Sequence, residues 1–391
     1  MKRYSNFYRL AALLFALLML ASCAQNPSFS ILPPSSGSVE GESVMADASV
    51  SLPKDSDDPS AAPTLPNVPA SPSGQASDQT SKSPSVSPDN GYEEPSQPSF
   101  LEPPSADPSP SPIEPNIPTE LPKDQPKFLC EQAFVYDVDN DCFWFLSGED
   151  RIIYPASTTK LLTILYARTL LPLEQRVRPG NELELVKVGS SIAYVKKHHI
   201  LTVEQLIEGM LLPSGNDAAY VLAAAGGRVL DPDAKDGKEA VAAFIVGMNE
   251  YAAKLGVTGS NFTNPDGYDD LDHYSTLEDM ALIARYAYND PIIRKYCNVV
   301  SDDVTYASGH LMTWTNTNSC LHQGSAYYSP YVNGLKTGTV NKEYYCLLSS
   351  AQIGERSFIF GFFGEKQAYD RFKDTLTAIE WIRKSGLVEF P

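Results

Sequence analysis

A hydroxyl and an amine lie three residues apart in the segment Ser157-Thr158-Thr159-Lys160. Serine is a poor nucleophile at neutral pH unless a base within hydrogen-bond reach takes its proton. On a helix, residues three apart share a face, so Lys160 is placed to be that base for Ser157. A lysine can accept a proton only if burial or a neighbouring cation lowers its pKa. Taken alone, Ser157 has a commoner interpretation, because serine is also a preferred cap of helix N-termini.

Two further polar clusters follow in the chain. Ser214-Gly215-Asn216 lies between two predicted helices, and Lys336-Thr337-Gly338-Thr339 lies just before a predicted strand. Each cluster alone is a weak signal, since Asn216 is also typical of a helix cap and Lys336 of a solvated strand end. Together and in this order, the patterns S-x-x-K, S-D-N and K-T-G mark class A β-lactamases and penicillin-binding proteins. Gly215 stands where the second pattern has Asp.

The elements that must position these clusters lie in the last two thirds of the chain. A globular domain is predicted over residues 128–391, about 260 residues, which is enough for one large core. Strand patterns at both ends of this domain, with helices between them, predict an α+β fold whose terminal strands meet in one antiparallel sheet. A helix is expected to open with a capping box at Ser275-Thr276-Leu277-Glu278 and to run to about residue 287. The other predicted elements are strands over 131–138, 142–147, 344–351 and 357–363, and helices over 156–170, 202–212, 217–225, 240–255 and 368–383.

Longer segments around the clusters resemble the D-alanyl-D-alanine carboxypeptidase family, the low-molecular-weight penicillin-binding proteins. The similarity covers roughly residues 128–383 and implies the β-lactamase/transpeptidase-like fold, an antiparallel sheet with helices on both faces. The chain departs from the family after K-T-G: Thr339-Val340 stand first, where an aromatic or His and then Thr are usual, and Glu343-Tyr344 occupy the place of an Ala-Gly pair. We therefore expect substrate contacts beside this strand to differ. The segments that carry the resemblance are YPASTTKLLT, MLLPSGNDAAYVLA, MNEYAAKLG, NFTNPDGY, HYSTLEDMALIARYA, NTNSCL and VNGLKTGT.

The resemblance implies a serine-type D-Ala-D-Ala carboxypeptidase, a hydrolase that acts through an acyl-enzyme on Ser157. Its Oγ would attack the carbonyl of the penultimate D-alanine in a peptidoglycan stem peptide and release the last D-alanine. Lys160, in its neutral form, would be the base, helped by a neighbouring cation at Lys336 that disfavours its charge. Ser214 would pass the proton to the leaving amine. β-Lactams would acylate the same serine as inhibitors.

The resemblance also implies a set of substrate-binding groups. Asn216 would hydrogen-bond the substrate amide, and Lys336 and Thr337 would hold its terminal carboxylate. Thr339, which follows in the same motif, is assigned to substrate binding as well. The backbone N–H groups of Ser157 and Thr339 would form the oxyanion hole. No cofactor and no metal ion are implied.

Two other functions compete with this interpretation. A β-lactamase of the same fold would need a carboxylate to activate the deacylating water, typically in a Glu-x-x-x-Asn pattern between the second and third clusters, and the sequence has none there. A catalytically silent wall-binding lipoprotein would have kept the fold and lost the chemistry. The intact motif residues argue against that loss. His273 and the three tryptophans, Trp144, Trp314 and Trp381, are interpreted as structural rather than catalytic.

The N-terminal third predicts the location of the protein. Residues 1–23 have a basic start and an apolar run of signal-peptide length that ends in Leu20-Ala21-Ser22-Cys23, which resembles a lipobox with Cys23 as the lipidated residue. The alternative is an ordinary signal peptide with a chance cysteine. Residues 24–127, rich in Pro, Ser, Asp and Glu, cannot bury enough apolar surface to fold and predict a disordered acidic linker. The chain ends soon after its last predicted helix, so we expect the lipid to replace a C-terminal anchor. The expected location is extracytoplasmic, on the outer face of a bacterial cell membrane.

Charge and cysteine content limit the partners further. The net charge of −18 argues against nucleic-acid binding and against an electrostatic grip on anionic lipid, because both favour basic proteins. Five cysteines remain besides Cys23, without a CxxC pair, and the histidines show no HxxxH spacing, so no metal site is expected. Cys130 and Cys142 either pair or remain buried thiols.

Overall fold

The computed structural model describes residues 121–122, 124–340 and 344–390. The predicted signal peptide, the lipidated Cys23, most of the 24–127 linker and Glu343 therefore lie outside the described residues. The segment before residue 128 already touches the domain where it is described. Leu121 packs against the core, and the Trp381 indole N–H donates to the Asp124 carbonyl at 2.6 Å.

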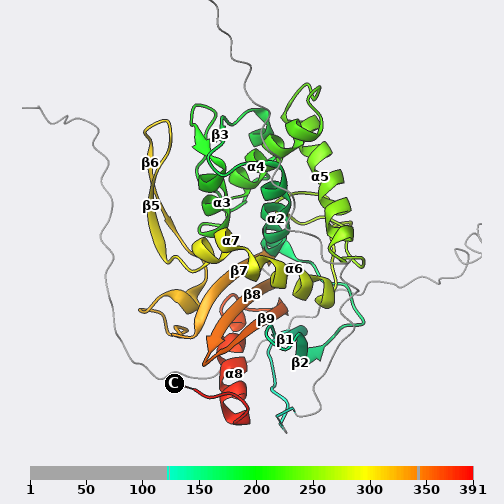
Figure 1. Ribbon diagram of the computed structural model, residues 1–391, viewed down its shortest axis with the longest axis vertical. Coiled ribbons are helices and arrows are strands. Elements are labelled where there is room, and N and C mark those ends of the chain that lie inside the picture. Colours follow the sequence, from blue (N-terminus) through cyan, green and yellow to red (C-terminus); the bar gives the residue numbers. More distant parts are fainter. Residues whose placement is uncertain (1–120, 123, 341–343, 391) are drawn as a thin grey trace, which may run out of the picture. The chain divides into compact units, whose positions relative to one another are not determined.

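A five-stranded antiparallel sheet forms the centre of the domain (Figure 1). The order of its strands is β2-β1-β9-β8-β7, so the N-terminal hairpin pairs with the C-terminal strands as expected. The strand that carries K-T-G was not predicted: the motif lies within β7, at the edge of the sheet, rather than before a strand. Two glycines and several polar side chains interrupt the alternation of apolar and polar residues by which a strand is recognised in a sequence. The strand forms because its backbone pairs with β8. The strands are β1 (Gln132–Asp137), β2 (Cys142–Ser147), β7 (Val332–Val340), β8 (Tyr344–Ile353) and β9 (Arg356–Glu365).

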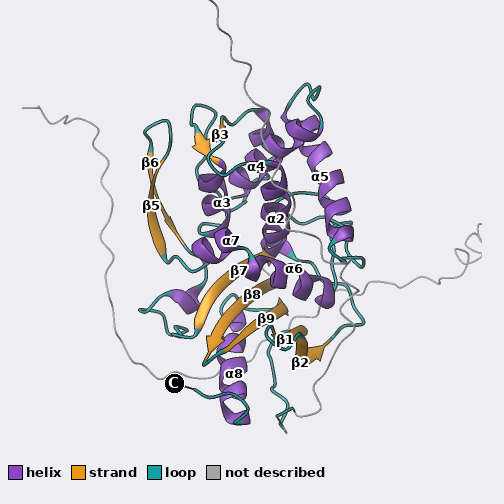
Figure 2. Ribbon diagram, viewed as in Figure 1, coloured by secondary structure: helices purple, strands orange, loops and turns teal. Residues whose placement is uncertain are grey.

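The sheet separates two hydrophobic cores because successive strand residues point to opposite faces. Phe358, Phe360 and Phe362 of β9 pack on one side with helix α8 (Asp370–Ser385). Ile359 and Phe363 face the opposite side, toward the larger helical layer. Helices therefore cover both faces of the sheet, which confirms the predicted α+β architecture of an antiparallel sheet between helical layers (Figure 2).

The larger helical layer is built around α4 (Asn216–Leu230), whose first twelve residues are all buried. Such a helix has no solvent face, and its run of Ala and Gly lets neighbours approach closely. A Cβ at Gly227 would lie 1.8 Å from the Ala240 carbonyl oxygen, so only glycine fits there. The helices that pack around α4 are α2 (Lys160–Leu170), α3 (Val203–Leu211) and α5 (Gly237–Lys254).

Helix α6 (Leu277–Asn289) begins one residue later than predicted. Its cap is Thr276, whose hydroxyl accepts from the Asp279 N–H at 3.1 Å. Ser275 cannot be the cap because its backbone N–H and C=O both pair with Ile153 in an extended bridge. The tertiary contact thus moves the start of the helix.

Several short elements were absent from the sequence prediction. They are α7 (Pro291–Cys297), the hairpin of β5 (Ser301–Thr305) and β6 (Leu311–Thr315), the pair β3 (Arg176–Val177) and β4 (Leu201–Thr202), and the 3₁₀ turns η2 (Asn181–Leu185) and η3 (Ser319–Leu321). Each is too short for a periodic pattern to stand out.

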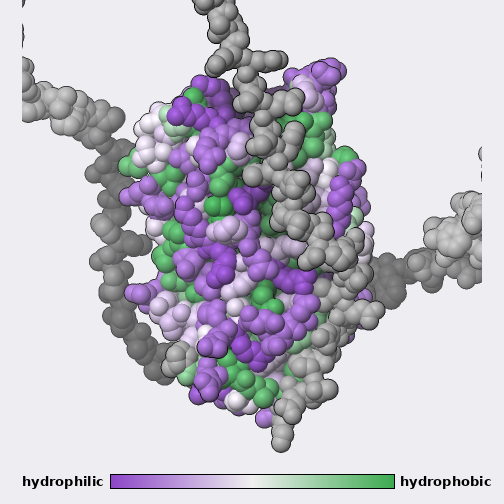
Figure 3. Space-filling view, in the orientation of Figure 1, coloured by the Kyte–Doolittle hydropathy of each residue, from purple (hydrophilic) through white to green (hydrophobic). Residues whose placement is uncertain are grey.

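Burial decides the expectation for the tryptophans, and the state of the cysteines decides that for Cys130 and Cys142. Trp144, Trp314 and Trp381 are all buried, which confirms them as core residues. The five described cysteines are free, so Cys130 and Cys142 are thiols and not a disulfide. No helix among the described residues has the length and apolar character needed to span a membrane. The face of the molecule in Figure 3 mixes hydrophilic and hydrophobic residues.

Candidate active site

Ser157 and Lys160 lie at a junction of two helix types. The predicted single helix is in fact a 3₁₀ turn, η1 (Ala156–Thr159), followed by α2, which begins at Lys160. Residues i and i+3 eclipse in a 3₁₀ turn, which brings the two side chains together. Nζ of Lys160 donates to Oγ of Ser157 at 2.9 Å. Neither η1 nor α2 has a side-chain cap, so the cap interpretation of Ser157 is wrong.

Lys160 is fully buried and has three neutral oxygen acceptors. Besides Ser157 it donates to the Asn216 Oδ1 at 2.7 Å and to the Asp266 backbone carbonyl at 2.8 Å. These three bonds use the three donors of an ammonium group. Burial lowers the pKa of Lys160 to about 8, while the charges of Asp266 and Asp217 partly oppose the shift. The amine is therefore neutral in a substantial fraction of molecules at mildly alkaline pH. Ser157, in contrast, is only half-buried and can be reached by a substrate.

The backbone around the nucleophile adopts uncommon conformations. Ala156, directly before Ser157, has φ 50°, and Ser214 has φ 62°. Such angles are costly for residues with a side chain and persist where surrounding contacts enforce them. At Ala156 the enforcing contacts are two glycines: a Cβ at Gly267 would lie 1.7 Å from the Ala156 carbonyl oxygen, and one at Gly338 would lie 3.0 Å from the Ala156 Cβ. The nucleophile turn is thus held between the 263–268 loop and β7.

The second motif forms the turn between α3 and α4. Ser214 is buried in this turn, and Gly215 is the N-cap of α4. Asn216 is the first residue of the helix and uses its side-chain oxygen for Lys160, so the cap interpretation of Asn216 is wrong. A Cβ at Gly215 would lie 2.7 Å from the Ala193 Cβ, which explains glycine at this position.

Asp217 organises the neighbouring loop and was missed by the sequence analysis. Its Oδ1 accepts from the Ala193 N–H at 2.7 Å and its Oδ2 from the Val195 N–H at 2.8 Å. The Trp314 indole donates to the Ala193 carbonyl at 3.1 Å, and the Asn216 N–H donates to the Ser191 carbonyl at 2.8 Å. The 190–195 loop is therefore fixed to the second motif. An acidic residue in the first turn of a helix is common and gave no signal of this role.

The third motif places a second buried lysine in the site. Lys336 on β7 is 1% exposed and donates to the Thr337 carbonyl at 3.1 Å. Burial, and then the charge of Lys160, lower the pKa of Lys336 well below its usual range. Burial is the leading cause of the lowered pKa at both lysines, and the repulsion between them adds to it only at Lys336. The expected help of Lys336 in lowering the pKa of Lys160 is therefore not found. Thr337 shares a 2.5 Å hydroxyl contact with Thr317, another neighbour that the sequence did not reveal.

Thr339 and its strand are held from the last helix. Thr339 is exposed on β7. Arg371 of α8 donates to the Gly338 carbonyl at 2.6 Å, to the Cys346 carbonyl at 3.3 Å and to the Thr339 Oγ1 at 3.4 Å. This buried guanidinium fixes the end of β7 that carries the motif.

His273 supports the base without contacting the nucleophile. Its Nε2 lies 2.9 Å from the Thr159 hydroxyl, and its Nδ1 accepts from the Thr263 N–H at 3.1 Å. Burial lowers its pKa to about 4, so the ring stays neutral. The structural interpretation of His273 therefore agrees with these contacts, although the residue it holds is next to Lys160.

Taken together, the geometry combines a half-buried hydroxyl, a buried amine of lowered pKa in contact with it, and a second buried amine whose pKa is lowered in part by the charge of the first. A hydroxyl beside such an amine can act as a nucleophile in acyl transfer. The structure brings Ser157, Lys160 and Asn216 into direct contact. It places Ser214 in the adjoining turn and Lys336, Thr337 and Thr339 on the neighbouring strand.

Comparisons with known proteins agree with this chemistry. A family model described as D-alanyl-D-alanine carboxypeptidase matches residues 123–367. The chain is 28% identical over 246 residues to D-alanyl-D-alanine carboxypeptidase DacF of Bacillus subtilis, covering 62% of this chain and 59% of that protein. It is 29% identical over 241 residues to DacC of Escherichia coli, covering 59% and 56%. The chain thus spans less than two thirds of the length of these two relatives.

Two solved structures share the fold. The Streptomyces K15 DD-transpeptidase superposes with a TM-score of 0.60 at 26% identity, covering 66% of this chain and 98% of that one. Penicillin-binding protein D2 of Listeria monocytogenes, in its ampicillin-bound form, superposes with a TM-score of 0.54 at 25% identity, covering 66% and 99%.

Proposed function

Because the chain belongs to the D-alanyl-D-alanine carboxypeptidase family, we propose that it is a serine-type D-Ala-D-Ala carboxypeptidase that acts through an acyl-enzyme on Ser157. The observation that carries the proposal is the 2.9 Å hydrogen bond between the half-buried Ser157 hydroxyl and the buried Lys160 amine. The proposed substrate is a peptidoglycan stem peptide that ends in D-Ala-D-Ala. Several relatives bear the name of this activity.

The proposed reaction begins when neutral Lys160 takes the proton of Ser157. Oγ then attacks the carbonyl carbon of the penultimate D-alanine, and the backbone N–H groups of Ser157 and Thr339 stabilise the oxyanion. The C–N bond breaks, Ser214 relays the proton to the leaving amine, and free D-alanine departs. Water then hydrolyses the ester and restores both side chains.

Substrate binding is assigned to the second and third motifs. Lys336 and Thr337 hold the terminal carboxylate, and an anion beside Lys336 would favour its charged form against the cost of burial. Asn216 holds the substrate amide while it orients Lys160 through the 2.7 Å bond. No step in this scheme uses a metal ion or a cofactor. β-Lactams would enter the same pocket and acylate Ser157.

The decisive experiment measures D-alanine release from a pentapeptide ending in D-Ala-D-Ala, together with labelling by a fluorescent penicillin. We expect the wild-type protein to release D-alanine and to stay labelled, and Ser157→Ala to do neither. Rapid loss of the label with hydrolysed penicillin would instead indicate the β-lactamase. Failure of the wild-type protein to label at all would leave the silent wall-binding lipoprotein.

The location of the protein is part of the proposal. We propose that residues 1–23 are removed as a signal peptide, that Cys23 receives a lipid, and that residues 24–127 tether the catalytic domain, 128–391, outside the cell membrane. The acidic, proline-rich composition of the tether supports an extended spacer. Mass spectrometry of the membrane-extracted protein would find a lipidated N-terminal Cys23. Cys23→Ser would shift the protein out of the membrane fraction.

A further inference from the structure

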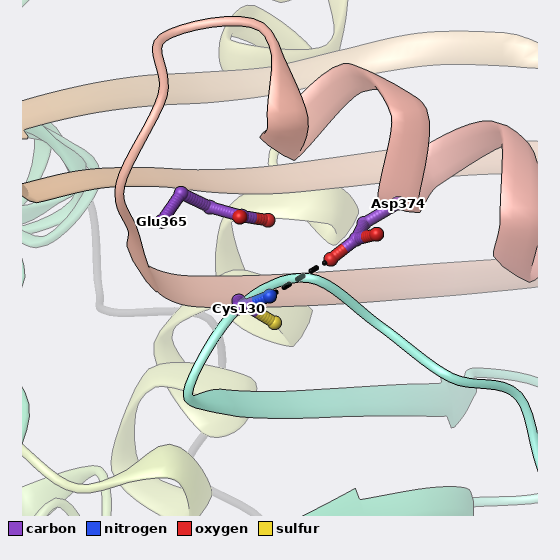
Figure 4. Close-up of side chains that lie close together, drawn as sticks. All are labelled: Cys130, Glu365 and Asp374. Atoms are coloured by element: carbon purple, nitrogen blue, oxygen red, sulfur yellow. Dashed lines mark hydrogen bonds between the residues drawn. The ribbon is translucent and has the colours of Figure 1, made fainter.

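A second cluster of ionisable groups lies outside the three motifs. Cys130 precedes β1, Glu365 ends β9, and Asp374 lies on α8 (Figure 4). Their sulfur and carboxylate oxygens all lie within 4.8 Å of one another. Cys130 is far from the other two residues in the sequence, and Glu365 and Asp374 are nine residues apart, so spacing rules for metal ligands could not detect the cluster.

Not all polar groups of this cluster have hydrogen-bond partners. Asp374 is 1% exposed, and its Oδ2 accepts from the Leu129 N–H at 2.7 Å and from the Cys130 N–H at 3.2 Å. Glu365 is fully buried and points into the cluster (Figure 4). Neither of its oxygens has a hydrogen-bond partner of normal geometry among the described residues, although the Asp374 carboxyl faces it. A buried carboxyl without a partner costs free energy that a ligand would recover.

The surrounding cations do not balance the cluster. Arg371 is close enough for its charge to favour the ionised form of Glu365, but its Nη1 is engaged with β7 and β8 carbonyls. Lys366 pairs with Glu131, and Lys373 pairs with Asp370. Burial raises the pKa values of Cys130, Glu365 and Asp374, and their mutual charges add to the shift at Cys130 and Glu365. With all three ligands ionised and Arg371 counted against them, two negative charges remain, which one divalent cation would neutralise.

We propose that Cys130, Glu365 and Asp374 form a binding site for a divalent transition-metal ion, with Zn²⁺ as the best match. A thiolate with two carboxylates suits zinc, whereas calcium and magnesium prefer oxygen ligands alone. On binding, the metal forms a bond to Sγ of Cys130, whose proton leaves to solvent, and the carboxyl proton of Glu365 leaves in the same way. Water completes the coordination. This site revises the expectation that the chain has no metal ligands.

The metal would cross-link separate segments of the folded domain. It would join the segment at Cys130, which precedes β1, to the end of β9 and to α8, which follow each other near the other end of the chain. Arg371, one turn before Asp374 on α8, holds the K-T-G strand. The site is proposed to stabilise the fold and to take no part in acyl transfer.

The test titrates the purified folded protein with Zn²⁺ by calorimetry at pH 8 and pH 6.5, and with Cd²⁺ by thiolate-to-metal charge-transfer absorption. We expect one equivalent to bind, proton release, weaker binding at pH 6.5 and a higher melting temperature with metal. Cys130→Ser should abolish the charge-transfer band, and Glu365→Gln should weaken Zn²⁺ binding by roughly tenfold or more. Cys142→Ser, which removes a thiol outside the cluster, is the matched control and should bind like the wild type.

Two results would overturn the proposal. The first is no binding of either metal to the wild-type protein at pH 8. The second is binding of equal affinity and stoichiometry in Cys130→Ser or Glu365→Gln, which would place the metal elsewhere. Penicillin labelling of each variant is measured in parallel. It reports on the Ser157 site, so failure of the metal site and failure of the proposed function remain distinguishable.

Discussion

Asp217 holds the backbone of Ala193 through a 2.7 Å hydrogen bond from the Ala193 N–H to its Oδ1. The adjacent Asn216 accepts a hydrogen bond from Lys160 at 2.7 Å, so the first turn of α4 fixes both the loop beside the site and the base.

Asp217→Asn would replace one carboxylate oxygen by a donor, which cannot accept from Ala193 or Val195. We expect a stability loss of about 1–3 kcal/mol and slower acylation. Melting temperature and penicillin acylation rate measure the two effects, with exposed Asp233→Asn as the control. Unchanged acylation in a stably folded Asp217→Asn protein would contradict the positioning role.

Ser157→Ala is expected to abolish penicillin labelling and D-alanine release while leaving the fold intact. Ser157 is half-buried and its hydroxyl contacts Lys160, so its loss should change stability by about 1 kcal/mol or less. Gel fluorescence and thermal unfolding provide the two measurements. Ser147→Ala, at an exposed serine that ends β2 at the opposite edge of the sheet from β7, is the control and should label like the wild type. Labelling of Ser157→Ala at the wild-type level would move the nucleophile to another residue.

The acylation rate is expected to rise with pH through the titration of Lys160. The ammonium form cannot accept a proton, and burial lowers its pKa to about 8, so the active neutral fraction grows from about pH 6, reaches one half near pH 8 and levels off about one pH unit higher. The second-order rate constant for penicillin acylation, measured from pH 6 to 9, should follow this curve. A rate that falls over the same range would show that the proton acceptor is not Lys160.

Lys336→Met is expected to weaken substrate binding more than it slows chemistry. The variant keeps most of the length of the buried side chain and removes the charge proposed to hold the terminal carboxylate. KM for the pentapeptide should rise by at least tenfold, about 1.4 kcal/mol. A peptide with a C-terminal amide serves as the control, because wild type and variant should process it equally poorly. Equal losses on both peptides would argue against carboxylate recognition by Lys336.

Gly338→Ala is expected to damage both stability and activity. Its Cβ would lie 2.4 Å from the Cys346 sulfur and 3.0 Å from the Ala156 Cβ, directly beside the nucleophile turn. Overpacking of this kind costs about 1–3 kcal/mol, and displacement of Ala156 should slow acylation. Gly324→Ala is the matched control, since a Cβ there meets no atom within 4 Å and its backbone angle is ordinary. Similar effects of the two substitutions would show that close packing at Gly338 is unimportant.

The long elements could be predicted from the sequence. The prediction failed for elements whose position depends on tertiary contacts. β1, β2, β8, β9 and the main helices are rich in apolar residues, and most of them formed within a few residues of the expected bounds. The exception is α4, which ends at Leu230, five residues after the predicted end at 225. β7 has two glycines and the K-T-G motif inside it, so its strand character depends on pairing with β8. α6 starts at Thr276 rather than Ser275 because the backbone of Ser275 is paired with Ile153.

For the site, the sequence by itself determined the side chains to which the proposed chemistry is assigned, since the types and order of Ser157, Lys160 and the two later motifs depend only on the chain. The tertiary structure alone decided their surroundings. The Asp266 carbonyl that accepts from Lys160, the Asp217 carboxylate that holds the 190–195 loop and the Cys130 cluster all join residues distant in the chain. The physical reason is that burial and nearby hydrogen-bond partners set the pKa of a lysine, and they also decide whether a buried carboxyl has a partner. Neither burial nor a contact with a distant backbone carbonyl leaves a local pattern in the sequence.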